Sequence, residues 1–125
     1  MLPKACAIVN QWSEIRRDDG DRSVALDALE YYRDMDFYGI LLEDQDGPQA
    51  IAFGSQITED TFDLHVTKAL LPSVDSYLKW ELYQRLPETI LWINQEEDLG
   101  LPGLRTNKTE SGPEAIIPLW KGVLL

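Results

Sequence analysis

The chain has 125 residues, enough for one domain with its own hydrophobic core, and 44% of them are apolar. Its 22 acidic and 11 basic residues give a formal charge of −11, which argues against nucleic acid as a partner because phosphate backbones would be repelled. The single cysteine excludes an internal disulfide and no apolar run is long enough for a membrane span, so we expect a cytoplasmic protein.

The first third of the chain predicts two helices. Between residues 4 and 17, apolar side chains recur at steps of three and four, which is typical of a helix with one buried face: Ala5, Ile8, Val9, Trp12 and Ile15. Cys6 lies on the same apolar face and is best interpreted as a core residue. A second helix runs to Met35, can be capped by Asp21 or Ser23, and carries a stripe of four apolar side chains: Ala25, Leu26, Leu29 and Tyr32.

The middle of the chain predicts three antiparallel strands, over residues 38–42, 49–56 and 61–68. The first two are joined by a turn in which Gly47 can adopt positive φ. In the third strand, apolar and polar residues alternate, which predicts one buried and one polar face. The apolar set is Phe62, Leu64 and Val66, and the polar set is Thr61, Asp63 and His65.

The last part predicts a helix from about Pro72 to Arg85, then a strand over residues 89–93, a short helix over 102–107 and a strand over 115–123. The buried stripe of the first helix is Val74, Tyr77, Leu78, Leu82 and Tyr83. Strand 89–93 is a short continuous apolar run, which indicates a strand covered on both faces and parallel to strand 61–68. We therefore expect an α/β (α+β) domain with a mixed sheet flanked by helices, in the order α-α-β-β-β-α-β-α-β.

Polar residues follow strand 89–93 at the carboxyl end, where ligands bind in open α/β sheets. Asn94 comes first, and the acids Glu96, Glu97 and Asp98 come next. These acids can supply the general base for acyl transfer to an amine, or they can solvate the loop and cap the helix near Pro102. No histidine accompanies them, so we predict no metal site.

Three cations and the single histidine complete the set of candidates. Arg105 and Lys108 are three residues apart on one helical face, where they can bind an anionic group or pair with the nearby acids. Lys68, near the end of the third strand, is a further candidate for substrate binding. His65 is either a catalytic base or a structural hydrogen-bonding residue.

Three local patterns in this order of elements resemble the GNAT (acyl-CoA N-acyltransferase) fold. More closely, they resemble the second acyltransferase-like half of a bacterial family of unknown function related to the phosphatidylglycerol lysyltransferase C-terminal domain. The similarity runs from about Trp12 to the C-terminus. The first pattern is Ala52, Phe53 and Gly54, and the second is His65, Lys68 and Ala69 followed by Tyr77. The third, which is the most specific, is Asn94, Glu96, Asp98, Leu99 and Gly100, followed by Leu104, Arg105, Lys108 and Pro113.

This resemblance implies one GNAT-like domain over residues 1–125, half of the usual tandem, that transfers an acyl or aminoacyl group to a small amine-containing substrate. It implies a cleft between the third and fourth strands, with Glu96 or Asp98 as base and Tyr77 as proton donor to the leaving group. The residues that it implies for substrate binding are Asn94, Arg105, Lys108 and Lys68.

The resemblance also implies acyl-CoA as donor, but the turn that would receive its pyrophosphate disfavours it. Residues 68–75 contain no glycine, Pro72 lacks an N–H, and Asp75 adds a negative charge. We therefore predict no cofactor firmly. The alternative function is a non-catalytic binding or assembly module with a degenerate cofactor site, which works as a homodimer or with a partner half-domain.

Overall fold

The computed structural model describes residues 1–17 and 21–96. The chain divides into two compact units, Met1–Asn94 and Gln95–Leu125, and all the helices and strands below belong to the first. The predicted helix 102–107 and strand 115–123 lie outside the described residues, as do Asp98, Arg105 and Lys108. In the described ranges, no helix has the length and apolar character needed to cross a bilayer.

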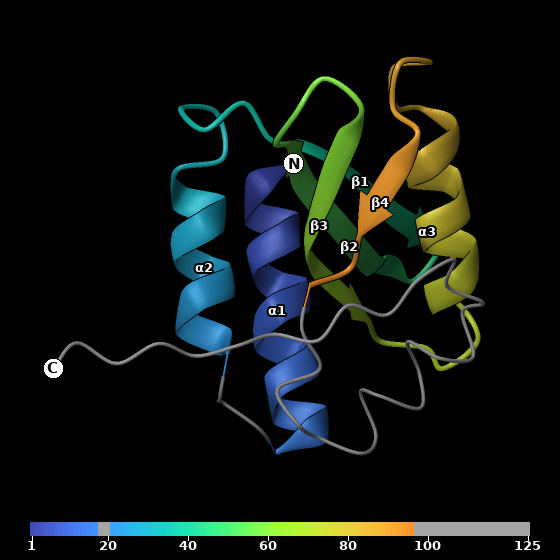
Figure 1. The fold of residues 1–125 in the computed structure, drawn as a ribbon. Coiled ribbons are helices and arrows are strands. Elements are labelled where there is room, and N and C mark those ends of the chain that lie inside the picture. Colours follow the sequence, from blue (N-terminus) through green and yellow to red (C-terminus); the bar gives the residue numbers. More distant parts are fainter. Residues whose placement is uncertain (18–20, 97–125) are drawn as a thin grey trace, which may run out of the picture. The chain divides into compact units, whose positions relative to one another are not determined.

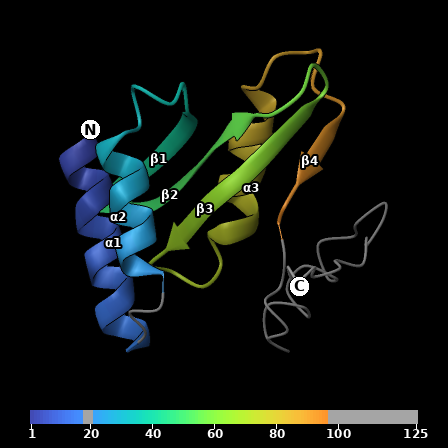
Figure 2. The same ribbon diagram turned by 60° about the vertical axis from the view of Figure 1, so that its left-hand side comes forward.

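The first unit is a mixed α+β fold with helices on both faces of one sheet. Helices α1 (Leu2–Arg16) and α2 (Arg22–Glu30) lie together on one side, and α3 (Asp75–Gln84) covers the other (Figures 1 and 2). The three helices were predicted. However, α2 ends at Glu30, short of the predicted Met35, because residues 31–36 form turns.

The sheet has four strands in the order β1-β2-β3-β4. They are β1 (Tyr38–Asp44), β2 (Gly47–Gln56), β3 (Thr61–Ala69) and β4 (Trp92–Asn94). The first three pair antiparallel, and β4 returns through α3 to pair parallel with β3, which confirms the predicted mixed sheet (Figure 1). Gly47 has a φ of 116°, as the predicted turn requires.

Each face of the sheet has its own apolar core. One lies beneath α1 and α2, and its buried members are Ala5, Ile8, Val9, Ala25, Leu29, Ile51, Phe53 and Val66. The other lies beneath α3, with Ala50, Ala52, Phe62, Leu64, Leu78 and Leu82. Cys6 packs against the first core, as its place on the apolar face of α1 predicted.

A β-bulge in β3 divides this strand between the two cores. Phe53 of β2 pairs with Val66, but the next residue, Gly54, pairs with Leu64, so that His65 is one extra residue in β3. Side chains alternate between faces along a strand, and one extra residue reverses which face receives them. Leu64 therefore packs under α3 and Val66 under α1, and the predicted single apolar face through both residues is wrong.

Several side chains predicted to be buried are exposed. Tyr77 on α3 is 54% exposed and Ile15 at the end of α1 is 64% exposed, because each lies at the margin of its apolar stripe. Strand 89–93 was expected to be covered on both faces. Instead, only residues 92–94 pair with β3, and Ile93 packs against the second core whereas Trp92 is 54% exposed. A strand covered on one face explains this alternation.

Candidate functional site at the bulge in the sheet

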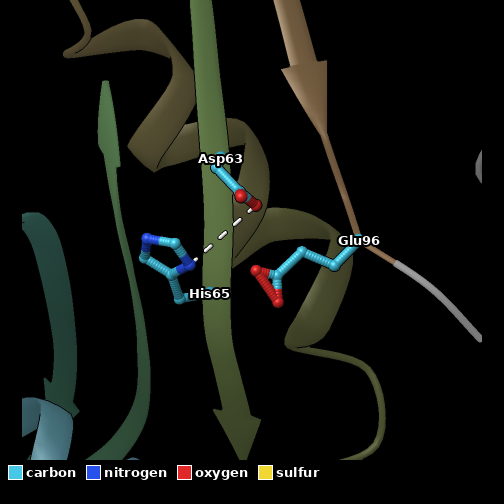
Figure 3. A group of neighbouring side chains, drawn as sticks. All are labelled: Asp63, His65 and Glu96. Carbon is cyan, nitrogen blue, oxygen red and sulfur yellow. Dashed lines mark ion pairs between the residues drawn. The ribbon is translucent and has the colours of Figure 1, made fainter. Parts of the chain in front are cut away.

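The bulge brings Ser55, Asp63 and His65 together. Ser55 and Asp63 are paired opposite each other in β2 and β3, and His65 follows two residues later. The Nε2 atom of His65 lies 2.8 Å from the Ser55 hydroxyl oxygen. The Nδ1 atom of His65 lies 3.9 Å from Oδ1 of Asp63 (Figure 3). The imidazole ring therefore lies between the hydroxyl of Ser55 and the carboxylate of Asp63.

The contacts of the His65 ring show on which face of the sheet this cluster lies. The His65 ring lies 5.4 Å, centroid to centroid, from Phe37, which packs against the core beneath α1 and α2. The side chains of His65 and Asp63 are 28% and 17% exposed, and Ser55 is also partly exposed. The cluster is thus at the margin of a core, where it is partly desolvated but still open to solvent.

This arrangement is suited to proton transfer. A carboxylate near Nδ1 favours the tautomer with the proton on that nitrogen, in which Nε2 is the acceptor for the proton of the Ser55 hydroxyl. Asp63 would also stabilise the imidazolium that forms, as carboxylates do in serine nucleophile systems. Asp63 and His65 are also residue types that bind metal ions.

Of the predicted site residues, Asn94 is placed beside Asp63 by the sheet. It is the last residue of β4, and its partner in the parallel pairing is Asp63. Glu96, also labelled in Figure 3, comes two residues after β4 and has a φ of 62°. Glu96 belongs to the second compact unit.

Lys68 is held in place by the first unit itself. Lys68 is 6% exposed. Its Nζ atom lies 2.7 Å from Oδ2 of Asp21 and 3.7 Å from the centre of the Trp12 ring. The Asp21 side chain, at the N-terminus of α2, makes this ion pair instead of a side-chain cap. The positive charge of Lys68 is therefore paired inside the fold, next to the strand that carries His65.

Tyr77 lies on the other side of the sheet from the serine and histidine. It is on the outer face of α3, where its ring stacks on Trp80 with centroids 6.2 Å apart. Its hydroxyl is hydrogen-bonded to the carboxylate of Glu81, and this bond is the main cause that raises the pKa of Tyr77. The structure therefore does not bring Tyr77 together with His65.

Ser55 and Asp63 were missed as site residues. Asp63 precedes His65 by two positions, so a strand would put both on one face, and this spacing was available in the sequence. The second signal was Gly54. A Cβ atom there would lie 1.9 Å from the backbone oxygen of Asp63, so the glycine permits an unusually close approach of the two strands beside Ser55.

Two open hollows lie at the ends of β3. One, of about 630 Å³, is lined by Thr58, Glu59, Asp60, Thr89 and Leu91, near the start of the strand. The other, of about 410 Å³, lies near its end, where the predicted cofactor turn begins, and is lined by Trp12, Ile15, Arg16, Ala69, Leu70 and Pro72. The first carries two acids and the second one arginine.

No protein-family model matches this chain, and no curated protein does. Among solved structures, the chain is similar to a conserved protein of unknown function from Bacteroides thetaiotaomicron VPI-5482. The TM-score is 0.83 and the sequence identity is 29%. The alignment covers 92% of this chain but only 42% of that one, so this chain spans less than half the length of its bacterial neighbour.

Proposed function

We propose that this chain is an acyltransferase-type domain that transfers an acyl or aminoacyl group to a small amine, with His65 as its general base. The observation that carries the proposal is the 2.8 Å contact between Nε2 of His65 and the hydroxyl of Ser55, with Asp63 near the other ring nitrogen. Acyl transfer to nitrogen needs a group that accepts the proton of the attacking amine. His65 can accept it through the Ser55 hydroxyl.

The charge distribution supports an amine as acceptor. The chain carries a formal charge of −11, and the hollow near the start of β3 is lined by Glu59 and Asp60. Opposite charges attract a protonated amine to such a surface and raise its local concentration. The amine must then lose a proton before it attacks a carbonyl carbon, which is the role that we give to His65.

The donor in this proposal is not restricted to coenzyme A. Pro72 and the absence of glycine in the turn after β3 disfavour close backbone contact with a pyrophosphate. The Asp75 carboxylate lies 3.0 Å from Lys79, which offsets part of its negative charge. Activated acyl or aminoacyl esters and acyl-CoA thioesters both remain donors to be tested.

A second candidate function, a module that assembles with a companion half-domain or with its own copy, is favoured by one observation. The bacterial neighbour is matched over 42% of its length, so a protein with this domain can contain a second region of comparable size. The two functions are compatible if the companion supplies part of the donor site. The mass of the native protein in solution, alone and with added companion, would test this candidate.

The test of the proposed activity begins with a thermal-shift screen against acyl-CoAs, aminoacyl esters, amino acids and polyamines. A ligand present at a hundred times its Kd stabilises the folded protein by about 2.7 kcal/mol. The pair that binds is then assayed for acyl transfer. We expect His65→Asn to lower the rate by roughly 100-fold or more, which is the usual contribution of general base catalysis.

Asp46→Asn is the matched control, because Asp46 lies in the exposed turn between β1 and β2. It changes one polar side chain and should leave both the rate and the melting temperature unchanged. A well-folded protein that binds nothing in the panel, or a transfer rate that His65→Asn leaves intact, would contradict the proposed function.

A further inference from the structure

We propose that Ser55 is the nucleophile of this site and carries the acyl group as an ester during transfer. This inference rests on the proposed function and makes it more specific, because it replaces direct attack by the amine with two successive attacks. In the proposed function alone, Ser55 only passes a proton to His65. Here its oxygen forms a covalent bond to the acyl group.

The geometry has the connectivity that activates a serine. The hydroxyl oxygen of Ser55 is 2.8 Å from Nε2 of His65, within the range for a nucleophile and its base. The carboxylate of Asp63 is on the side of the other nitrogen, at 3.9 Å. This second distance is longer than a hydrogen bond, and such contacts in ligand-free sites often shorten when a substrate binds.

Ser55 is singled out among the serines because His65 is the only histidine of the chain. Ser13 is 1% exposed within α1 and therefore inaccessible to a donor. Ser76 is exposed on α3, on the other side of the sheet, and so serves as a reference for ordinary surface hydroxyls. Ser55 combines partial exposure with a direct contact to a base.

The backbone beside the serine is also fixed. Gly54 lies against the carbonyl of Asp63, with no room for a Cβ atom, so β2 and β3 are held close together one residue before Ser55. Nucleophile and base come from two strands of one sheet. Sites on regular elements hold their side chains more accurately than sites on loops.

The reaction would proceed in two balanced steps. First, the Ser55 oxygen attacks the acyl carbonyl carbon, its proton passes to Nε2 of His65, and the bond to the leaving group breaks as that group takes the same proton. Next, the amine attacks the ester carbon, its proton passes to His65, and the bond to Ser55 breaks as the serine oxygen recovers that proton. The products are the free leaving group and the amide, and neither step needs an oxidant or a reductant.

Reaction with a fluorophosphonate tests this inference, since such probes phosphonylate activated serines. Whole-chain and peptide mass spectrometry should find one adduct, on Ser55. We expect Ser55→Ala to abolish that adduct and His65→Asn to slow it by roughly 100-fold or more, while Ser76→Ala reacts like the unchanged protein. Circular dichroism and thermal melts on every variant confirm that each one is folded.

The outcomes separate the two proposals. If His65-dependent acyl transfer is measured but a folded protein shows no adduct on Ser55, the amine attacks the donor directly and the nucleophile proposal is overturned. If Ser55 reacts as fast in His65→Asn as in the unchanged protein, the contact with His65 does not activate it and the proposal is equally overturned. An adduct on Ser55 that depends on His65, in a protein without acyl transfer, supports the nucleophile and contradicts the acyltransferase.

Discussion

The two ends of β3 present polar side chains toward the same side of the sheet, but in different ways. Near the end of the strand, Lys68 is enclosed between the ring of Trp12 and the carboxylate of Asp21. Around the bulge, the side chains of Asp63 and His65 are 17% and 28% exposed, and the imidazole contacts a serine hydroxyl. The comparison shows that one strand holds both an enclosed charge and a partly exposed histidine, and we propose that this histidine is a base.

The difference between Lys68 and the bulge arises from the groups that surround each of them. A buried ammonium must have a partner, because an unpaired charge in a protein interior carries a large desolvation penalty. Lys68 has both an ion pair and an aromatic face, so its interactions are largely satisfied within the fold. The bulge leaves the serine, the histidine and the aspartate at the margin of a core instead, where all three are partly exposed.

The largest effect is expected from Gly54→Ala, which tests whether the close approach of β2 and β3 at the bulge is needed for stability. The added Cβ would lie 1.9 Å from the backbone oxygen of Asp63, so a strand must move. We expect a loss of about 3 kcal/mol in the free energy of unfolding, the upper end for overpacking, measured by urea denaturation. Reaction of Ser55 with the probe should fall as well.

Gly47→Ala is the matched control for that substitution. Its φ of 116° strains any other residue, but no atom lies within 4 Å of the added Cβ. We expect it to lower the free energy of unfolding by about 1 kcal/mol through backbone strain alone and to leave the site unchanged. An alanine at position 54 that is tolerated as well as one at 47 would show that the close strand approach is not needed.

The ion pair between Lys68 and Asp21 is tested by two substitutions whose effects on the free energy of unfolding should differ in size. Asp21→Ala leaves the buried Lys68 charge without its carboxylate, and we expect a loss of about 2 kcal/mol, reduced from the usual value for buried pairs because the Asp21 side chain is 58% exposed. Lys68→Met keeps the contact with Trp12 and leaves only an exposed acid, so we expect a loss below about 1 kcal/mol. Equal losses in thermal or urea unfolding would contradict this asymmetry.

Much of the fold could be predicted from the sequence, because helix stripes and strand alternation report local burial. The three helices, the antiparallel strands, the Gly47 turn and the parallel return of β4 all followed from such patterns. The bulge could not be found in this way. Residues Phe62, Leu64 and Val66 alternate perfectly in sequence, yet only the pairing with β2 shows that one extra residue sends them to two different cores.

The candidate site was predicted less well for a related reason. His65 was recognised by residue type, but its contact with Ser55 depends on the register of β2 and β3 at the bulge, which composition and spacing do not contain. The ion pair of Lys68 with Asp21 was not predicted, because nothing in the sequence indicates that Asp21 reaches it, and the predicted role of Lys68 in substrate binding stays a prediction. Asp98, Arg105 and Lys108 lie outside the described residues, and their predicted roles stay predictions.

The smallest effect is expected at Tyr77, which gives the comparison an exposed reference on the far side of the sheet. The hydrogen bond to Glu81 and the charge of that acid raise the pKa of Tyr77 above its ordinary 10.0. The same hydrogen bond is the main cause that lowers the pKa of Glu81, and a hydrogen bond from Arg85 lowers it further. Glu81→Gln should therefore return the tyrosine pKa toward its ordinary value, as measured by ultraviolet titration with Tyr77→Phe subtracted.

The sign of the linked stability follows from these directions. The contribution of Tyr77 to the free energy of unfolding is complete below its unfolded-state pKa and is lost as the pH rises through its raised folded-state pKa. The contribution of Glu81 is complete above its unfolded-state pKa and is lost as the pH falls through its lowered folded-state pKa. Both side chains interact on a solvated helix face, where exposed pairs contribute little, so Tyr77→Phe should hardly change the melting temperature at neutral pH. It should also leave the reaction of Ser55 unchanged, and slower acyl transfer in this variant would restore Tyr77 as the proton donor that the resemblance implied.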